Sequence, residues 1–187
     1  MPAARARRPR SAHAAARQAG GRRSWTRIPS PIGDLILVGE AGTLREIRFT
    51  AGSRPQSAPA DADEDPGPFE AVARQLREYF AGERREFDVP LALEGTPFQR
   101  RVWDALLDVG YGRTATYADI ARAIGQPKAV RAVGLANGRN PIPIIVPCHR
   151  IIGSDGTLTG YGGGLPIKRK LLELEGVIPG GTRSLFG

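Results

Sequence analysis

Short apolar runs separated by turn residues mark the first part of the chain. Residues 25–28, 34–39 and 43–49 are rich in apolar and β-branched side chains, whereas residues 31–33 (Pro-Ile-Gly) and 40–42 (Glu-Ala-Gly) favour turns. Runs at this spacing are typical of strands joined by tight turns. The pattern therefore predicts a small antiparallel β-meander.

The periodicity then changes along the chain. Residues 69–80 place apolar side chains at helical spacing, and residues 85–93 have the composition of another strand. Residues 51–68 are rich in Ala, Pro, Asp and Ser and lack a core pattern, so we predict a mobile loop there. Residues 24–95 are thus expected to form a sheet domain with one helix against it, and this part shows no catalytic chemistry.

Helical patterns dominate the second half. Residues 96–99 (Thr-Pro-Phe-Gln) form a capping-box sequence, and the apolar stripe that follows predicts a helix up to Gly110. Two shorter helices are expected over residues 116–124 and 128–137, with a Gly-Gln-Pro turn at residues 125–127. Helix, glycine-containing turn and helix favour a helix-turn-helix. The predicted fold class is α+β, a sheet domain followed by a mainly helical domain.

Charge divides the chain into three parts. The net charge of +8 includes seven arginines and no acid within residues 1–23, which are typical of a disordered basic tail. A transit peptide is the alternative for this segment. Residues 24–95 hold eight basic and thirteen acidic residues, whereas residues 96–187 hold twelve and six. The positive half predicts nucleic acid as the partner.

The composition excludes several classes of protein. With 41% hydrophobic and 25% charged residues, the chain is neither collagen-like nor generally disordered, and no apolar run reaches the length of a membrane span. One cysteine forms no internal disulfide, and one cysteine with two histidines builds no cysteine-rich zinc site. We therefore predict no metal and no cofactor.

The single cysteine lies where chemistry is expected. Cys148, His149 and Arg150 follow an apolar, proline-stiffened run that starts at Asn140 and that we expect to be extended. His149 supplies a base and Arg150 a positive field, both of which favour the nucleophilic thiolate. Adjacent side chains on an extended backbone point apart, so a water is the expected proton route between Cys148 and His149. A buried structural cysteine remains the alternative.

Glu175 is the candidate to orient the base. A last helix is expected over residues 166–175, and Glu175 ends it just before Gly176. A carboxylate at this end opposes the helix dipole, and a catalytic base needs an orienting group. A solvated glutamate beside a helix cap is the alternative.

These residues resemble the O6-alkylguanine-DNA alkyltransferases, also called methylated-DNA–protein-cysteine methyltransferases. The active-site motif stands as residues 147–151 (Pro-Cys-His-Arg-Ile), preceded by Asn140-Pro141. The resemblance runs from Thr96 to Gly176. It includes, in order, Phe98-Gln99, Val102-Trp103, Thr116-Tyr117, Arg131-Ala132-Val133-Gly134, Gly160-Tyr161, Gly163-Gly164-Leu165 and Leu172 to Gly176. It implies a ribonuclease-H-like sheet domain followed by a winged helix-turn-helix-type domain at residues 96–187.

The resemblance implies direct-reversal DNA repair by a protein that acts once per chain. Cys148 would accept the alkyl group from O6-alkylguanine, and from O4-alkylthymine, after the nucleotide is flipped. His149 would act as the base through a water, with Glu175 fixing its tautomer and Asn140 bonding near the thiolate. No residue would remove the alkyl group from the thioether, so transfer would be irreversible.

The resemblance also implies a DNA-binding surface on double-stranded DNA, on the minor-groove side. Tyr117 would help rotate the target nucleotide, and Arg131 would fill the stack that the flipped base leaves. Gly162 stands where some relatives have a larger residue, which would widen the alkyl pocket toward bulkier adducts. The residues assigned to substrate or DNA are Tyr117, Arg131, Arg150, Tyr161, Gly162, Ala129 and Ala132.

Three other functions remain as alternatives. A non-catalytic damage-recognition protein similar to the alkyltransferase-like proteins would lack the acceptor cysteine. A helix-turn-helix regulator would bind undamaged operator DNA without taking up alkyl label, and a thiol hydrolase would turn over repeatedly. We expect a monomer, with cooperative binding on DNA left open. A reactive thiol without an export signal indicates the cytoplasm or the nucleoid.

Overall fold

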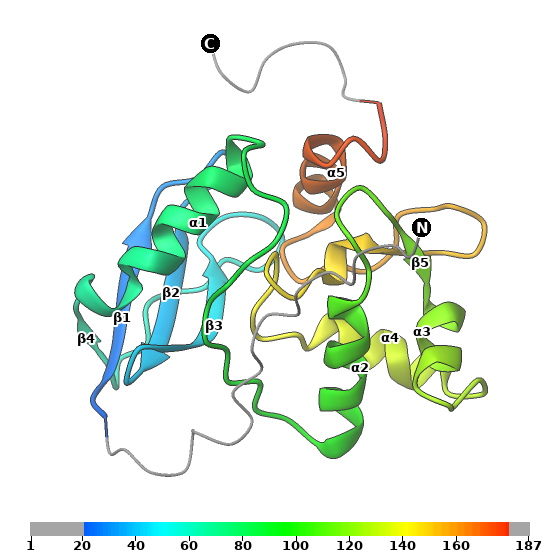
Figure 1. Cartoon of the computed structure of the whole chain (residues 1–187), viewed down its shortest axis with the longest axis horizontal. Helices are drawn as coiled ribbons and strands as arrows, with labels where there is room; N and C mark the ends of the chain where they lie inside the picture. Colours follow the sequence, from blue (N-terminus) through cyan, green and yellow to red (C-terminus); the bar gives the residue numbers. More distant parts are fainter. Residues whose placement is uncertain (1–20, 180–187) are drawn as a thin grey trace, which may run out of the picture.

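The computed structural model describes residues 21–179, and the predicted meander is present in it. Strands β1 (Arg23–Ile28), β2 (Leu35–Glu40) and β3 (Thr43–Phe49) pair antiparallel in sequence order (Figure 1). Most of the predicted tail, residues 1–20, lies outside the described residues. Arg23, however, begins β1 and pairs with Asp61 and Glu46, so the sheet starts before the predicted end of the tail.

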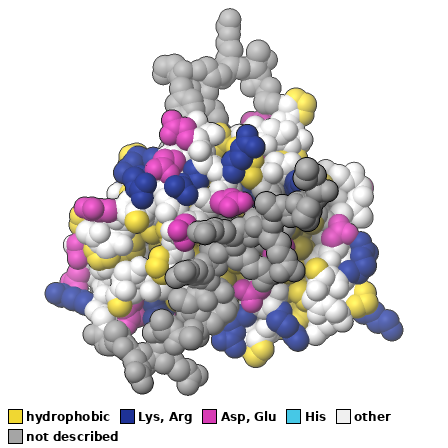
Figure 2. Space-filling view, viewed as in Figure 1, with side chains coloured by type: hydrophobic (Ala, Val, Ile, Leu, Met, Phe, Trp, Pro, Cys, Tyr) yellow, Lys and Arg dark blue, Asp and Glu magenta, His cyan; other side chains and the backbone are white. Residues whose placement is uncertain are grey.

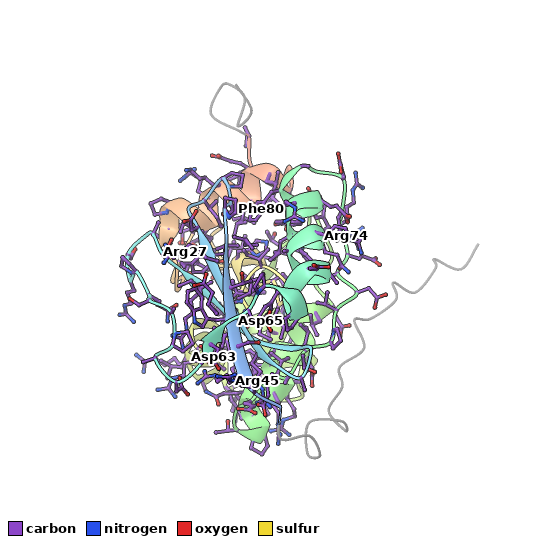
Figure 3. All side chains as sticks on the ribbon, turned by 90° about the vertical axis from the view of Figure 1, so that its left-hand side faces the viewer. Arg27, Arg45, Asp63, Asp65, Arg74 and Phe80 are labelled. Atoms are coloured by element: carbon purple, nitrogen blue, oxygen red, sulfur yellow. The ribbon has the colours of Figure 1, made fainter. Side chains whose placement is uncertain are left out.

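The loop after β3 is more ordered than its composition predicted. Strand β4 (Asp63–Glu64) lies within it and pairs parallel with β1, which gives the sheet the order β3-β2-β1-β4. Asp63 is labelled at this edge of the sheet in Figure 3. A short 3-10 helix, η1 (Gly67–Phe69), then leads into α1 (Glu70–Phe80), the predicted helix, which crosses the sheet (Figure 1).

The prediction of a strand over residues 85–93 is wrong. Only an isolated bridge forms there, between Leu91 and Leu44, with hydrogen bonds from Leu44 N to Pro90 O and from Ala92 N to Leu44 O. Pro90 has no N–H to donate to a ladder, and this explains why the pairing does not extend.

The second half contains the predicted helices. Helix α2 (Pro97–Leu107) begins at a complete Thr96–Gln99 capping box, and α3 (Tyr117–Ala123) and α4 (Val130–Gly138) follow across a turn. Trp103 Nε1 donates to Ala136 O at 2.9 Å, which ties α2 to α4. Within residues 21–179, no helix is long and apolar enough to cross a membrane.

Three short elements complete this half and position the candidate site. Strands β5 (Ala115–Thr116) and β6 (Ile151–Ile152) pair in parallel. The 3-10 helix η2 (Cys148–Arg150) immediately precedes β6, and α5 (Leu165–Leu174) ends at Glu175. A backbone hydrogen bond from Ile47 N to Pro141 O joins β3 of the sheet domain to the segment that leads to η2.

Surface charge alone does not locate a DNA-binding face. Where the side chains are described, the face in Figure 2 carries basic and acidic groups side by side and no continuous basic patch.

Candidate active site

The segment before Cys148 is folded back, so the prediction of an extended run is wrong. Ile144 has a φ of 77°, and Val146 N donates to Ile142 O at 2.9 Å. Proline restricts its own φ and the residue before it, which leaves Ile144 unrestricted between Pro143 and Ile145. Cys148 itself begins the short helix η2.

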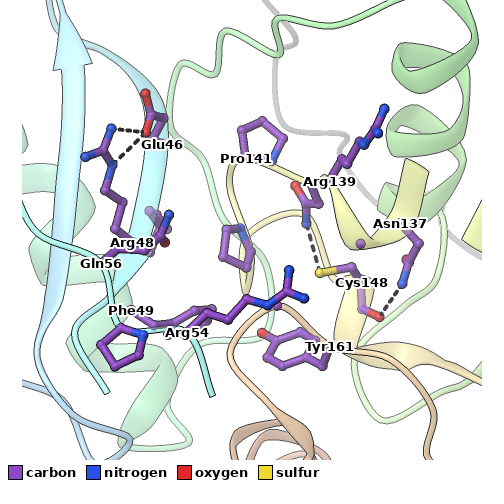
Figure 4. Close-up of a pocket in the computed structure, with 16 residues that line it drawn as sticks. Glu46, Arg48, Phe49, Arg54, Gln56, Asn137, Arg139, Pro141, Cys148 and Tyr161 are labelled. Atoms are coloured by element: carbon purple, nitrogen blue, oxygen red, sulfur yellow. Dashed lines mark hydrogen bonds and ion pairs between the residues drawn. The ribbon is translucent and has the colours of Figure 1, made fainter. Parts of the chain in front are cut away.

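Asn140 holds this folded segment in place. Its Oδ1 accepts from Ile142 N at 3.0 Å, while its Nδ2 donates to Val146 O at 2.8 Å and to Cys148 Sγ at 3.0 Å. The bond to sulfur is drawn in Figure 4. One amide therefore shapes the turn and donates to the nucleophile, in keeping with the role expected for it.

Burial decides the charge of the nucleophile. Cys148 is 4% exposed, and burial raises the pKa of its thiol to about 11, although the hydrogen bond from Asn140 and the charge of Lys168 act in the other direction. The base and the positive field expected from His149 and Arg150 therefore do not by themselves make Cys148 a thiolate in the free protein. The thiol is the resting form, and a base must take its proton.

His149 is the candidate for that base. It is fully buried, and burial lowers the pKa of its imidazole despite the hydrogen bond to Glu175, so the ring is neutral. Nε2 lies 2.8 Å from Glu175 Oε1. An ionised carboxylate only accepts, so Nε2 carries the hydrogen and Nδ1 keeps its lone pair. Among the described residues, Nδ1 has no hydrogen-bond partner.

Five hydrogen bonds fix the Glu175 carboxylate. Besides His149, it accepts from Tyr79 Oη at 2.7 Å, from Gly112 N at 3.2 Å, and twice from Arg150, at 2.8 and 2.9 Å. Burial opposes ionisation, but the hydrogen bonds from His149 and Arg150 outweigh it and lower the pKa of Glu175 to about 2. The predicted pairing of Glu175 with His149 is thus present in the geometry.

Arg150 was expected to contact substrate or DNA, but it lies in the interior of the protein. Its side chain is buried, and its remaining hydrogen bond goes from Nη1 to Val109 O at 2.6 Å. A guanidinium used in this way does not reach DNA, so its assignment to substrate or DNA is wrong. Its physical role is to neutralise and orient Glu175.

A cavity of about 380 Å³ opens beside Cys148, between the two halves of the chain (Figure 4). The helical half contributes Asn140, Tyr161 and Gly162 to its lining. Tyr161 and Gly162 are the two residues that were expected to line the alkyl pocket. A Cβ atom added at Gly162 would meet nothing within 4 Å, so this position leaves room. Tyr161 packs its ring 5.8 Å from Phe49 of β3.

The sheet domain lines this cavity, and sequence reasoning missed that contribution. Phe49 and Arg54 come from β3 and the loop after it, and the Arg54 side chain extends toward Tyr161 and Cys148 in Figure 4. No local motif marks either residue, because each is brought to the site by the packing of two domains.

The residues assigned to DNA on α3 and α4 are exposed or half-buried. Arg131 and Ala132 are exposed on α4, and Ala129 is half-buried at its start. Tyr117 begins α3, and its Oη lies 3.4 Å from Thr159 O. Leu135, which was missed, is 67% exposed one helical turn after Arg131. The sequence signal for Leu135 is that it is a large apolar residue on the polar side of the predicted helix.

Comparisons with known proteins match both halves of the chain to the two domains of one family. Residues 24–93 match the family described as "6-O-methylguanine DNA methyltransferase, ribonuclease-like domain", and residues 97–177 match the "DNA binding domain" of the same name. The methylated-DNA–protein-cysteine methyltransferase of Methanosarcina acetivorans is 54% identical over 147 residues, covering 79% of this chain and 94% of the relative. The Mycobacterium tuberculosis protein of that name is 56% identical over 148 residues, covering 79% and 89%.

Solved structures extend the similarity to the fold. The M. tuberculosis protein OGT in complex with DNA is 55% identical with a TM-score of 0.76, covering 81% of this chain and 92% of that one. The M. tuberculosis O6-methylguanine methyltransferase is 52% identical with a TM-score of 0.77, covering 84% and 96%. The chain therefore belongs to the methylated-DNA–protein-cysteine methyltransferase family.

Proposed function

We propose that this protein repairs alkylated DNA by direct reversal, moving the alkyl group from O6 of guanine to Cys148. The observation that carries the proposal is the arrangement around one sulfur. Cys148 lines a cavity, Asn140 donates to its Sγ at 3.0 Å, and the neutral His149 beside it is held by Glu175. Family membership supports the same reaction.

The chemistry follows from the protonation states. The Cys148 proton leaves for His149 Nδ1 through a bridging water, because the buried thiol has a pKa of about 11 and His149 is neutral. Sulfur then forms a bond to the alkyl carbon as the carbon–oxygen bond breaks. The electron pair stays with the guanine, which takes up a proton; we assign this proton to the Tyr117 hydroxyl, which regains one from solvent. The thioether product is a poor leaving group, so each chain acts once.

The target base has to leave the duplex to reach Cys148. The sulfur is almost fully buried, so an intrahelical base cannot approach it, and flipping costs a few kcal/mol. We assign α4 to the minor groove, where the small Ala132 permits close approach and the exposed Arg131 enters the vacated stack. The protein is taken to bind as a monomer.

The deciding experiment measures protein mass after incubation with duplex DNA containing O6-methylguanine. We expect one added methyl group per chain, located on Cys148, and none with Cys148→Ala. Parallel duplexes with O4-methylthymine and O6-benzylguanine test the wider pocket at Gly162. Repeated turnover would instead indicate a thiol hydrolase. Tight binding of undamaged DNA without added mass, under reducing conditions, would indicate a regulator.

Arg131→Ala is expected to slow transfer from duplex DNA by about tenfold to a hundredfold, since the flipped state loses the group that fills the stack. Transfer from free O6-benzylguanine needs no flipping and should keep its rate. Arg74→Ala, which removes an exposed arginine from α1, is the matched control. Equal slowing with duplex and free base would contradict the role of Arg131 in flipping.

A further inference from the structure

One side chain of the sheet domain reaches the carboxylate that orients the base. Tyr79 lies on α1, is fully buried, and donates its Oη hydrogen to Glu175 Oε1 at 2.7 Å. Its ring is held by Phe80, Phe87 and Tyr111, with centroids 5.4, 5.5 and 6.1 Å away. The hydroxyl therefore points at Glu175 because the ring has no freedom to turn elsewhere.

The same carboxylate oxygen serves three donors. Glu175 Oε1 accepts from Tyr79 Oη, from His149 Nε2 at 2.8 Å and from Arg150 Nη2 at 2.9 Å. An oxygen of this kind offers about two lone-pair directions, so the three donors share its electron density. Each added donor weakens the pull of Glu175 on the imidazole hydrogen and thereby favours the neutral ring.

Further titratable groups lie around this pair, and two of them donate elsewhere. Lys168 Nζ donates to Ile151 O and Thr159 O, and Tyr111 Oη donates to Leu174 O at 3.1 Å. The groups that face Glu175 and His149 are Tyr79 from α1, Tyr111 after α2, Cys148 and Arg150 from η2, Tyr161 before α5, and Lys168 from α5.

We propose that Tyr79 is a positioning residue of the sheet domain, which fixes Glu175 and limits its hold on His149 so that the imidazole stays available as the base. This inference rests on the proposed function, in which His149 takes the thiol proton. It gives the sheet domain a part in the chemistry, besides its part in lining the cavity.

The test compares Tyr79→Phe with Tyr111→Phe in the full chain. Both variants keep the ring and remove one hydroxyl next to Glu175, but only Tyr79 donates to the carboxylate. In Tyr79→Phe, Glu175 binds the imidazole hydrogen more strongly and raises the pKa of His149. We expect the acidic limb of the transfer-rate profile to move up by about half to one pH unit. Tyr111→Phe should follow the wild-type profile.

A second readout does not depend on transfer. The chain has two histidines, so His13→Gln leaves His149 as the single imidazole. The nitrogen-15 spectrum of His149 should show the hydrogen on Nε2. In Tyr79→Phe the ring should become protonated at a higher pH than in the wild type. Adding Tyr79→Phe to Glu175→Gln should not change the titration of His149 further. Unchanged profiles and spectra, or equal changes in Tyr111→Phe, would overturn the role of Tyr79. A wild-type protein that acquires no alkyl group would instead refute the proposed function.

Discussion

Glu175→Gln slows alkyl transfer by about a hundredfold to ten-thousandfold, the range that a positioned general base contributes. Glutamine offers one acceptor oxygen where the carboxylate accepts five hydrogen bonds, so the His149 hydrogen is no longer fixed on Nε2. Single-turnover transfer from O6-methylguanine DNA measures the loss. Glu173→Gln, on the same helix two residues earlier, is the matched control. A rate within a factor of about two of wild type would refute the assigned role.

The same substitution changes stability and its dependence on pH. It leaves the Arg150 guanidinium buried without its anion, a loss of about 3–5 kcal/mol in the free energy of unfolding. The pKa of Glu175 is about 2 in the folded protein, below its ordinary 4.5. Its contribution is therefore present above pH 4.5 and lost as the pH falls through about 2. Urea unfolding between pH 2 and pH 7 should show a flatter pH dependence for Glu175→Gln than for wild type.

Asn140→Asp removes the donor to the nucleophile while keeping the acceptor for Ile142 N. The bonds from Nδ2 to Cys148 Sγ and Val146 O disappear, and a negative charge faces the sulfur as it becomes a thiolate. The pKa of Cys148 then rises beyond about 11, and transfer at neutral pH falls by at least about a hundredfold.

Iodoacetamide labelling against pH measures that change without DNA. In the wild type, labelling of the single cysteine should increase up to a pH of about 11, and in Asn140→Asp the whole curve should move to higher pH. Asn137→Ala is the control, because Asn137 bonds the backbone oxygen of Cys148 at 3.5 Å and not its sulfur, and alanine adds no charge beside the thiol. Superimposed curves for wild type and Asn140→Asp would show that the amide does not influence the thiol.

The parts of the fold that depend on local patterns were predictable. The β-meander follows from short apolar runs and turn residues, and the start of α2 follows from the Thr96–Gln99 capping box. The pairing of Glu175 with His149 could be anticipated because a carboxylate at a helix C-terminus is unfavourable unless something compensates it. In each case the signal in the sequence is local, although the Glu175–His149 hydrogen bond joins two elements.

What depends on packing between segments far apart in the sequence, or on one side chain bonding a distant backbone group, was not predictable. Arg150 resembles a surface cation in the sequence, and its burial against Glu175 depends on the position of α5. Tyr79 and Glu175 are separated by 96 positions, and Arg54 reaches the cavity only because the two halves meet there. The prolines around Ile144 suggested an extended segment. The turn there is instead held by the side chain of Asn140, an interaction that proline content does not reveal.

The position of Glu175 in the chain sets the order in which a newly made protein can acquire its chemistry. During synthesis Tyr79, Gly112, His149 and Arg150 all leave the ribosome before the carboxylate that joins them. Until then the guanidinium of Arg150 lacks its counter-charge, and His149 has no partner to select its tautomer. An unfinished chain thus carries the acceptor cysteine beside a base that is not yet oriented, so we expect alkyl transfer to be slow until Glu175 has joined the site.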